Sequence, residues 1–377
     1  MKRILHVISA LPSGGAETML LRLLSATATA YDHAVVSLKD EGTVGPRIKE
    51  LGIPVYALGL SPDRPNPFRI LSIRSLARRL QPDLIQGWMY HGNVMASLAR
   101  SGLPKPVPVL WGIHQSLDMI GGWGRSTKAV IRLGAWLSGR PAATVYVSRV
   151  GARQHQAIGY DPTRSLVIPN GIDCTVFVPD EIAREAVRSE LGIPPDSILI
   201  GLVARYHPMK DHIGFLRAAK LVAGAHPDAR FLLVGKGVST QAAVLAKIQE
   251  LELQDRVLLL GERDDMHRIT ASLDINCSSS AWGEAFSVAV AESMSCGIPC
   301  VVTDVGDNGY VVSGTGITVP PADPTALARG IAQLIEAGRT GRQHLGELAR
   351  RRIETEFSLS LVARRYTELY QQYLTGV

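Results

Sequence analysis

Short apolar runs alternate along the whole chain with longer stretches in which apolar residues recur at helical spacing. Runs of strand length that alternate with helices are typical of parallel sheets whose two faces are covered by helices. In the first half, strands are predicted at 3–9, 33–38, 54–58, 83–86, 107–112, 143–147 and 165–168, and helices at 17–29, 69–80 and 92–100.

The pattern restarts after a segment near residues 169–180, where prolines and a glycine interrupt any periodicity. We therefore predict an α/β chain of two doubly wound, Rossmann-like domains, an N-terminal domain at 1–175 and a C-terminal domain at 176–359. In such domains ligands bind beyond the carboxyl ends of the strands, so the two domains are expected to face a cleft. The second set of strands is predicted at 198–204, 230–234, 256–260, 274–277 and 299–303, with helices at 211–224, 239–250, 264–272 and 286–296.

Composition supports two folded cores, because 46% of the 377 residues are apolar and 20% are charged. The apolar runs fall short of the ~18 residues that cross a membrane. Lys2 and Arg3 precede an apolar run that resembles a signal peptide, but His6 interrupts it, so a first strand is favoured. The four cysteines have neither metal-site nor disulfide spacing, which favours reduced thiols and a cytoplasmic location.

The two halves differ in charge. Residues 1–180 contain 20 Lys and Arg against 11 Asp and Glu (20 − 11 = +9), whereas residues 181–377 contain 20 against 23 (20 − 23 = −3). A basic N-terminal half favours an anionic partner, such as lipid headgroups or a phosphate-linked acceptor. A solvated arginine-rich surface explains the asymmetry equally well. Nucleic acid is disfavoured, because the basic residues are scattered and lack interleaved aromatic residues.

Two loops have the residue types that hold phosphate groups. Gly14 and Gly15 lie between the first predicted strand and a helix, where free N–H groups and close backbone approach favour an anion. A tight turn without a ligand would use the same glycines. Arg205 and Lys210 follow the first strand of the second domain, and two cations at this spacing suit a diphosphate. A solvated loop remains the alternative.

Two acidic residues flank the start of a predicted helix. Glu284 lies in the loop at its start, and Glu292 lies about two turns further on. They differ by ~80° around a helix, so two separate roles are favoured over an acid/base pair, although the helix dipole alone also favours Glu284.

No metal or redox cofactor is predicted. No two aspartates are spaced by one residue, so an Asp-x-Asp metal-binding motif is missing. The loop that starts at Gly235 resembles the start of a dinucleotide fingerprint, but Thr240 occupies the third glycine position, which disfavours a nicotinamide site.

Taken in order, these motifs resemble the retaining GT-B glycosyltransferases of family four, of the bacterial surface-polysaccharide type. Residues 284–292 resemble that family's Glu-x7-Glu motif, and residues 296–304 resemble the stretch that follows it. His114 and the segment at 169–173 also occur in the family's order. The resemblance covers most of the chain and implies a nucleotide-sugar donor that is used without a metal ion.

The resemblance assigns expected roles to individual residues. Arg205 and Lys210 would neutralise the leaving diphosphate, Glu284 would bind donor-sugar hydroxyls, and His114 would contact the sugar near the reacting carbon. These four are the expected catalytic residues. The expected donor-binding residues are Gly14, Gly15, Arg205, Lys210, Gly235, Arg263, Glu284, Phe286, Ser287, Val288 and Glu292, the last of these on the ribose.

Two further expectations come from the family. Ser287 occupies a position where the family usually has glycine, which puts the shape of the sugar pocket in question. A C-terminal helix within 360–377 would pack back onto the N-terminal domain. A donor phosphate oxygen would take the acceptor's proton, so no dedicated base is expected.

The expected reaction moves a hexosyl or N-acetylhexosaminyl group to a glycan or lipid-linked glycan in the synthesis of a cell-surface lipopolysaccharide or exopolysaccharide. UDP is favoured over GDP as the donor nucleotide, and peripheral binding to an anionic membrane is a further expectation. Trp88, His91 and Trp111 are the candidate acceptor residues, although the two tryptophans suit a core equally well. A GT-B nucleotide-sugar epimerase, a dehydrogenase and a catalytically silent nucleotide-binding scaffold remain alternatives.

Overall fold

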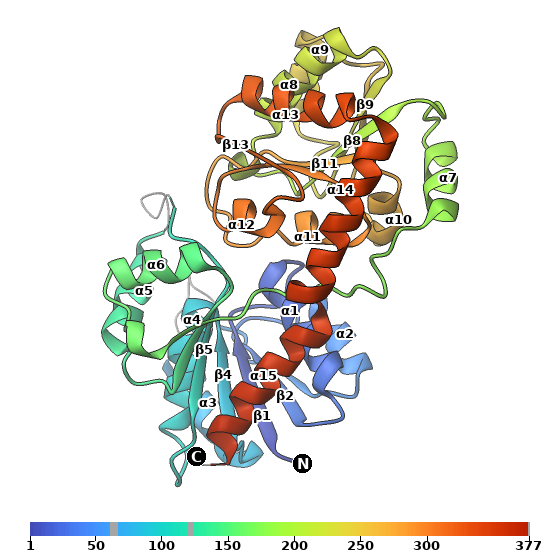
Figure 1. The fold of residues 1–377 in the computed structure, drawn as a ribbon. Coiled ribbons are helices and arrows are strands. Elements are labelled where there is room, and N and C mark those ends of the chain that lie inside the picture. The colour runs from blue at the N-terminus through green and yellow to red at the C-terminus, as the bar shows by residue number, and fades with distance from the viewer. Residues whose placement is uncertain (61–66, 119–123, 376–377) are drawn as a thin grey trace. The chain divides into compact units, whose positions relative to one another are not determined.

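The computed structural model describes residues 1–60, 67–118 and 124–375, and it divides into two compact units (Figure 1). Unit 1 comprises Met1–Gly171 and Leu359–Val377, and unit 2 comprises Ile172–Ser358. The sequence placed the corresponding boundaries after residues 175 and 359.

Unit 1 contains a parallel sheet of seven strands in the order β3-β2-β1-β4-β5-β6-β7. The central strands β1 and β4 are buried along almost their whole length, as expected for a sheet covered on both faces. The strands are β1 (Arg3–Ile8), β2 (Asp32–Ser37), β3 (Val55–Ala57), β4 (Leu84–Trp88), β5 (Val109–Ile113), β6 (Ala143–Tyr146) and β7 (Ser165–Val167).

Helices pack on the unit 1 sheet, and the last helix of the chain is among them. Helix α15 buries Val362, Tyr366 and Tyr370 in the same core as residues of β1 and β4. The helices are α1 (Gly15–Thr27), α2 (Val44–Glu50), α3 (Pro67–Leu80), α4 (Met89–Arg100), α5 (Arg125–Leu137), α6 (Arg149–Ala157) and α15 (Leu359–Leu374), with a short 3₁₀ turn at Pro162–Arg164.

Unit 2 contains a second parallel sheet, in the order β10-β9-β8-β11-β12-β13. Its strands are β8 (Ile198–Val203), β9 (Ala229–Val234), β10 (Val257–Leu260), β11 (Ile275–Ser278), β12 (Cys300–Thr303) and β13 (Ile317–Val319). Its helices are α7 (Glu181–Glu190), α8 (His212–Ala225), α9 (Ala242–Glu250), α10 (Met266–Ala271), α11 (Val288–Ser295), α12 (Asn308–Val312), α13 (Pro324–Glu336) and α14 (Gly338–Arg352), with a 3₁₀ turn at Pro208–Lys210 and a π turn at Ile353–Phe357.

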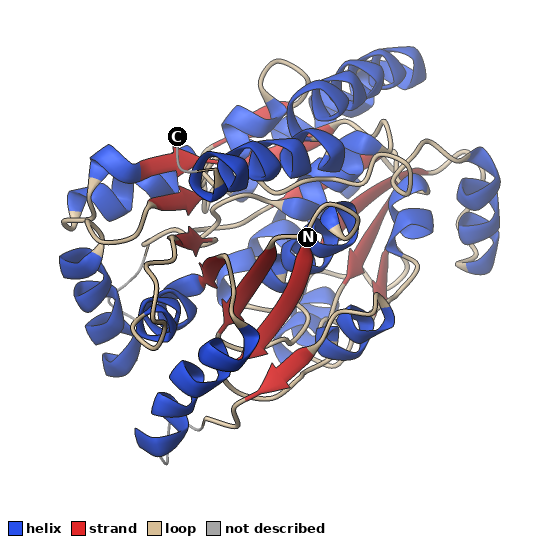
Figure 2. Cartoon of the chain, turned by 90° about the horizontal axis from the view of Figure 1, so that it is seen from below, coloured by secondary structure: helices blue, strands red, loops and turns tan. Residues whose placement is uncertain are grey.

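The predicted fold class is confirmed, since both units are parallel α/β sheets flanked by helices (Figure 2). Strand order reverses between β1 and β4 in unit 1 and between β8 and β11 in unit 2. Ligands of doubly wound sheets bind beyond the carboxyl ends of the strands at such switch points. The loops that follow β8 and β11 therefore mark the first place to look for a site in unit 2.

One helix begins earlier than predicted. The helix predicted at 92–100 begins at Met89, directly after Trp88, because β4 extends past the strand predicted at 83–86 and ends at Trp88. Met89 has a φ of 62°, so the chain turns from strand to helix at a single residue. Sequence periodicity does not register a turn this short.

Candidate functional site

The loops after β8 and β11 are bonded to each other at the switch point of unit 2. The Ala281 N–H donates to the Met209 carbonyl at 2.8 Å, and the Ser279 hydroxyl donates to the Lys210 carbonyl at 2.7 Å. These bonds join two loops that the sequence treated as separate motifs. They bring the predicted diphosphate-binding loop and the predicted sugar-binding loop together.

Lys210 and Glu284 form a bidentate ion pair at this place. Lys210 Nζ lies 2.7 Å from Glu284 Oε2 and also bonds Oε1. Both side chains are largely buried, with 18% of the Lys210 side chain and 7% of the Glu284 side chain exposed. A buried carboxylate requires a partner, and Lys210 supplies it. One spot therefore offers a cation for phosphate oxygens and a carboxylate for sugar hydroxyls.

Two glycines from neighbouring loops pack closely against the backbone of the β8 and β11 loops. Gly235 has a φ of +148°, and a Cβ there would lie 2.3 Å from the Ala204 carbonyl oxygen. Gly306 has a φ of +61°, and a Cβ there would lie 2.0 Å from the Glu284 carbonyl oxygen. Both positions therefore require glycine. Predicted donor residue Gly235 thus supports the β8 loop by its lack of a side chain.

The turn that carries Lys210 ends in an unusual conformation. Asp211 has a φ of 47°, in the left-handed region that residues with a side chain seldom adopt. Its carboxylate accepts a hydrogen bond of 2.9 Å from the Gly214 N–H and so caps the start of α8. This cap offsets the conformational cost and fixes the direction in which the chain leaves Lys210.

Positive charge gathers on the β8 loop. Arg205 is exposed just beyond the end of β8. The pKa of His207 is lowered by burial and by the neighbouring charges of Arg205 and Lys210, which disfavour a third cation. The sequence reasoning did not single out His207. Its position midway between the two predicted cations was the available signal.

Helix α11 begins just after Glu284. Phe286 is buried and packs against Phe357, with ring centroids 5.7 Å apart, and Val288 is the first residue of the helix. Ser287 has a φ of −79°, an ordinary conformation for serine, so the backbone does not require the family's glycine here. Glu292 is half-buried on the next turn of the helix.

Arg263 follows β10 and binds carboxylates within unit 2. Its guanidinium donates two hydrogen bonds of 2.8 Å to Asp265 and one of 3.1 Å to Glu190. To bind the nucleotide sugar as predicted, Arg263 would use an N–H group that does not already donate to these acids.

In unit 1, the glycine loop precedes α1 as predicted. Gly14 is the N-cap residue and contributes no side-chain capping bond, and Gly15 faces open space. A Cβ on Gly14 would lie 2.5 Å from Glu17 Oε2. Burial raises the pKa of Glu17, because the carboxylate is removed from water.

The His114 imidazole stacks on the Trp88 ring, with centroids 5.0 Å apart and planes inclined by 22°. Burial lowers the pKa of His114 to about 4, and the neighbouring Asn170 side chain opposes this only in part. The imidazole is therefore neutral near pH 7. Trp88 itself is fully buried, as the core interpretation expected.

A series of hydrogen bonds connects the Trp88 indole to other buried residues of unit 1. The Trp88 Nε1–H donates to His6 Nδ1 at 3.1 Å. A tryptophan N–H only donates, so neutral His6 is protonated at Nε2 and donates to His33 Nδ1 at 3.1 Å. His33 in turn donates to the Thr27 hydroxyl at 3.0 Å, and Thr27 donates to the Leu23 carbonyl at 2.6 Å.

The other two predicted acceptor residues differ in exposure. Trp111 is 1% exposed and donates its N–H to Ser97 Oγ at 3.1 Å, which is core packing. His91 is exposed on α4, and its pKa is lowered by local burial and by Lys39. Of the three, His91 alone presents its side chain at the surface of unit 1.

The described part of the chain contains no group of three or more His, Cys, Asp or Glu side chains placed to hold a metal ion. The four cysteines, Cys174, Cys277, Cys296 and Cys300, carry free thiols.

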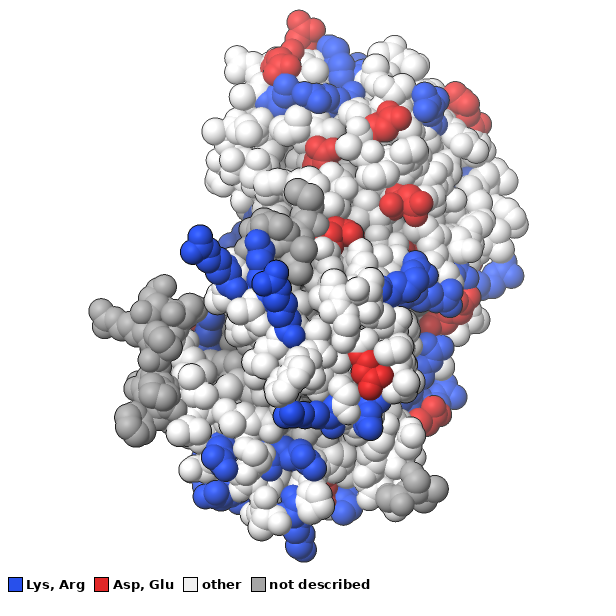
Figure 3. All heavy atoms as spheres, turned by 90° about the vertical axis from the view of Figure 1, so that its left-hand side faces the viewer, with Lys and Arg blue, Asp and Glu red and all other residues white. Residues whose placement is uncertain are grey.

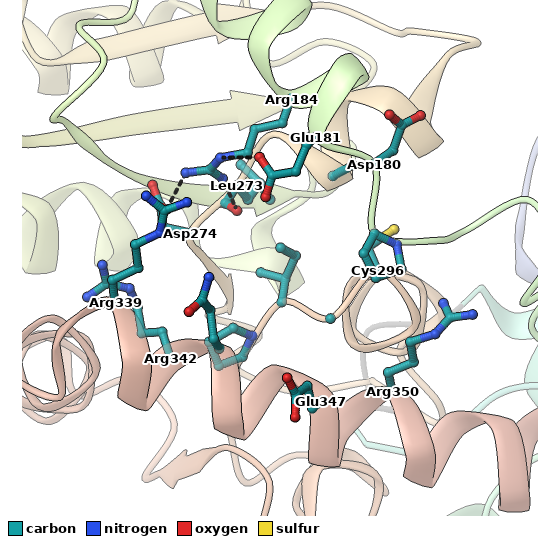
Figure 4. A pocket seen from close by; sticks show the side chains of 16 residues that line it. Asp180, Glu181, Arg184, Leu273, Asp274, Cys296, Arg339, Arg342, Glu347 and Arg350 are labelled. Atoms are coloured by element: carbon teal, nitrogen blue, oxygen red, sulfur yellow. Dashed lines mark hydrogen bonds and ion pairs between the residues drawn. The ribbon is translucent and has the colours of Figure 1, made fainter.

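A separate cavity of about 420 Å³ lies at the amino ends of the unit 2 strands, next to α7 and α14 (Figure 4). Arg184 and Arg188 share the Asp274 carboxylate there, at 2.6 and 3.0 Å. Four arginines and four acidic residues line this cavity in equal numbers: Arg184, Arg339, Arg342, Arg350, Asp180, Glu181, Asp274 and Glu347. The Arg184–Asp274 ion pair holds α7 to the residue that precedes β11.

Comparison with known proteins identifies two matching family models. Residues 13–176 match the model described as Glycosyltransferase Family 4, and residues 183–352 match the model described as Glycosyl transferases group 1.

Two relatives illustrate the similarity. The UDP-Gal:alpha-D-GlcNAc-diphosphoundecaprenol alpha-1,3-galactosyltransferase of Escherichia coli is 32% identical over 154 residues, which are 40% of this chain and 40% of that protein. The N-acetyl-alpha-D-glucosaminyl L-malate synthase of Bacillus anthracis is 26% identical over 292 residues, which are 74% of this chain and 72% of that protein.

Among solved structures, Anabaena HepE in complex with UDP superimposes with a TM-score of 0.86 at 20% identity, over 99% of this chain and 100% of that one. At that identity the likeness shows the fold.

Proposed function

We propose that this chain, which belongs to the family-four glycosyltransferases of the GT-B fold, moves a hexosyl or N-acetylhexosaminyl group from a UDP-sugar to a lipid-diphosphate-linked glycan. The name of the E. coli relative supports this proposal, since it contains a UDP-sugar donor and a diphosphoundecaprenol-linked acceptor. A GDP-sugar is the second candidate donor. The product would belong to a cell-surface polysaccharide.

The observation that carries the proposal is the Lys210–Glu284 pair, whose lysine shares the loop after β8 with exposed Arg205. When the glycosyl–phosphate bond breaks, its electron pair stays on the diphosphate oxygen. Lys210 and Arg205 stabilise that growing negative charge, and fixed cations of this kind lower the barrier because they need no reorganisation. Removal of one such donor commonly reduces the rate by about 10²–10³-fold.

Glu284 and Glu292 accept hydrogen bonds from hydroxyl groups of the donor. When the diphosphate attracts Lys210, the Glu284 carboxylate becomes available to accept hydrogen bonds from sugar hydroxyls. Glu292 accepts from the ribose. The family resemblance gives Gly14, Gly15 and His114 in unit 1 contacts with the donor. These contacts stay predictions, and each can be tested by substituting the residue.

Retention of anomeric configuration is part of the proposal. A donor phosphate oxygen takes the acceptor's proton on the face from which the diphosphate leaves, so the acceptor oxygen attacks from that same face. The bond from the anomeric carbon to the phosphate oxygen breaks as the bond to the acceptor oxygen forms. No protein side chain needs to act as nucleophile or base.

Transfer assays with the purified chain test the proposal. Radiolabelled UDP- and GDP-sugars are offered with a short prenyl-diphosphate N-acetylglucosamine acceptor, and the anomeric configuration of the product is read by NMR. Lys210→Met is expected to lose at least ~10²-fold in turnover. Lys220→Met is the matched control, since Lys220 pairs with Glu252 on the surface of unit 2.

Two results would contradict this function. Isomerisation of the nucleotide sugar without an acceptor would support the epimerase alternative. Equal turnover by Lys210→Met and the unmodified chain would remove the electrostatic role on which the proposal depends.

We also propose that the chain works at the inner face of the cell membrane, where lipid-linked acceptors are found. In residues 1–60, 67–118 and 124–375, no helix is long and apolar enough to cross a bilayer.

A further inference from the structure

Helix α5 presents one continuous face to solvent. Arg125, Ala129, Arg132, Leu133 and Trp136 lie on this face, within an arc of about 100° at 100° per residue. All five are exposed, including 40% of Leu133 and 71% of Trp136. We call these five residues the α5 face.

The other side of α5 explains why this face is left outside. Ile131 and Gly134 are buried against the core of unit 1. The Tyr160 hydroxyl donates to the Ile131 carbonyl at 3.2 Å, and a Cβ on Gly134 would lie 2.4 Å from that same hydroxyl. The helix is thus fixed in its rotation, and Trp136 cannot turn inward without breaking this packing.

The charged residues of α5 and the turn that follows it have a single sign. Residues 124–140 contain four Lys and Arg and no Asp or Glu. The Arg140 guanidinium lies 4.7 Å from the centroid of the Trp136 ring, so a cation accompanies the exposed aromatic side chain. Figure 3 shows the side of the molecule on which α5 lies, where blue groups outnumber red ones over unit 1.

An exposed tryptophan among arginines has the chemistry of a membrane interface. Tryptophan favours the headgroup region, where its ring is buried and its N–H stays hydrated. Arginine guanidiniums pair with lipid phosphates in a bidentate manner. Single-stranded nucleic acid fits less well, because its binding proteins stack successive bases on several aromatic side chains and this face has one.

We propose that the α5 face docks unit 1 on a bilayer that contains anionic lipid headgroups. The helix lies in the plane of the interface, with Trp136 and Leu133 among the headgroups and with Arg125, Arg132 and Arg140 on lipid phosphates. The biological role of this docking rests on the proposed function, since docking would bring the enzyme to a lipid-linked acceptor. Its measurement needs no catalysis, so failure of docking and failure of transfer are separate results.

Vesicle sedimentation tests the docking. The full chain is mixed with sucrose-loaded vesicles of phosphatidylcholine alone or of phosphatidylcholine with phosphatidylglycerol. Binding to the anionic vesicles is expected, with little binding to the neutral ones, and it should weaken as salt is raised. Arg132→Glu should reduce the partition coefficient at least ~5-fold, because each basic residue near an anionic surface contributes about 1 kcal/mol. Trp136→Ser should also weaken binding.

Matched controls lie elsewhere on the chain. Arg47→Glu reverses an exposed charge on α2. This helix connects β2 and β3, which lie at the other edge of the unit 1 sheet. Ile182→Ser removes an apolar side chain that is 84% exposed on α7 of unit 2. Both variants should bind like the unmodified chain. Thermal unfolding of all four variants shows whether each is folded.

Fluorescence gives a second measurement. Brominated anionic lipids should quench the unmodified chain more than Trp136→Phe, because the ring of Trp136 would lie among the lipids. The proposal is overturned if anionic vesicles bind no more protein than neutral ones, or if Arg47→Glu loses as much binding as Arg132→Glu. Equal quenching of the two chains, or a concentration-dependent dimer that Trp136→Ser abolishes, would also overturn it.

Discussion

Lys210 and Glu284 are 74 positions apart in sequence, yet Lys210 Nζ lies 2.7 Å from Glu284 Oε2. The pair joins the loop after β8 to the loop after β11 across the switch point of the unit 2 sheet. The side chains proposed to bind phosphate and sugar therefore lie next to each other. We therefore expect substitutions of Lys210 and of Glu284 to change the binding of UDP and of a UDP-sugar in different ways.

Glu284→Gln should weaken binding of a UDP-sugar at least ~10-fold, because hydrogen bonds to a charged acceptor contribute about 1.5–3 kcal/mol. Binding of UDP should be unchanged or tighter, since Lys210 loses its competing partner. Isothermal titration with UDP and with the UDP-sugar measures both. If the variant loses affinity for both ligands equally, Glu284 supports the loop and does not bind sugar.

UDP should raise the pKa of His207. In the free protein this pKa is lowered by burial and by Arg205 and Lys210. A bound diphosphate would neutralise the two cations, so protonation of the imidazole becomes easier and its pKa moves back toward the usual value near 6.5. NMR titration of the ring with and without UDP tests this. An unchanged or lower pKa on binding would place the diphosphate away from this loop.

Trp88→Phe should destabilise unit 1 by about 1–3 kcal/mol. The phenyl ring can still stack on His114, but the buried His6 Nδ1 loses its donor, and unpaired buried polar groups cost this much. Urea unfolding measures the change. Trp136→Phe serves as the control, since that side chain is 71% exposed. A loss below about 0.5 kcal/mol would show that the hydrogen bond contributes little.

Acid should destabilise unit 1 already between pH 7.5 and 5.5. Burial lowers the pKa of His33, His114 and His155 to about 4, against about 6.5 in an unfolded chain. Over this range the unfolded chain binds more protons, so the free energy of unfolding falls as pH falls, by about 1 kcal/mol per histidine. This contribution is fully present above about pH 6.5 and is lost by about pH 4. A constant free energy of unfolding from pH 7.5 to 5.5 would contradict it.

Much of the fold followed from hydrophobic pattern. All the predicted strands occur, because short runs that are buried on both faces stand out against amphipathic helices. Strand β13 was not predicted, since its three residues follow closely on Gly314 and Gly316 and only Val319 is buried. Such an edge strand is defined by its pairing with β12 rather than by its own pattern.

The site was harder to predict, because its key relations join distant residues. Sequence spacing gave Lys210 and Glu284 separate roles and contained no sign that they pair. His6 was read as an interruption of an apolar run, whereas it links Trp88 to His33 through buried hydrogen bonds. Both relations depend on which strands are neighbours in a sheet, and this order appears only once the chain is folded.

Thermal unfolding of the purified chain with UDP tests the central claim most directly, since it asks whether this chain binds the donor nucleotide through Lys210. UDP at ~100 times its dissociation constant should add about 2.7 kcal/mol to the free energy of unfolding, and Lys210→Met should remove most of this gain. Lys220→Met should keep it, and NAD should have no effect. Stabilisation by NAD alone, or an equal gain from UDP in Lys210→Met and the unmodified chain, would contradict the proposed donor site.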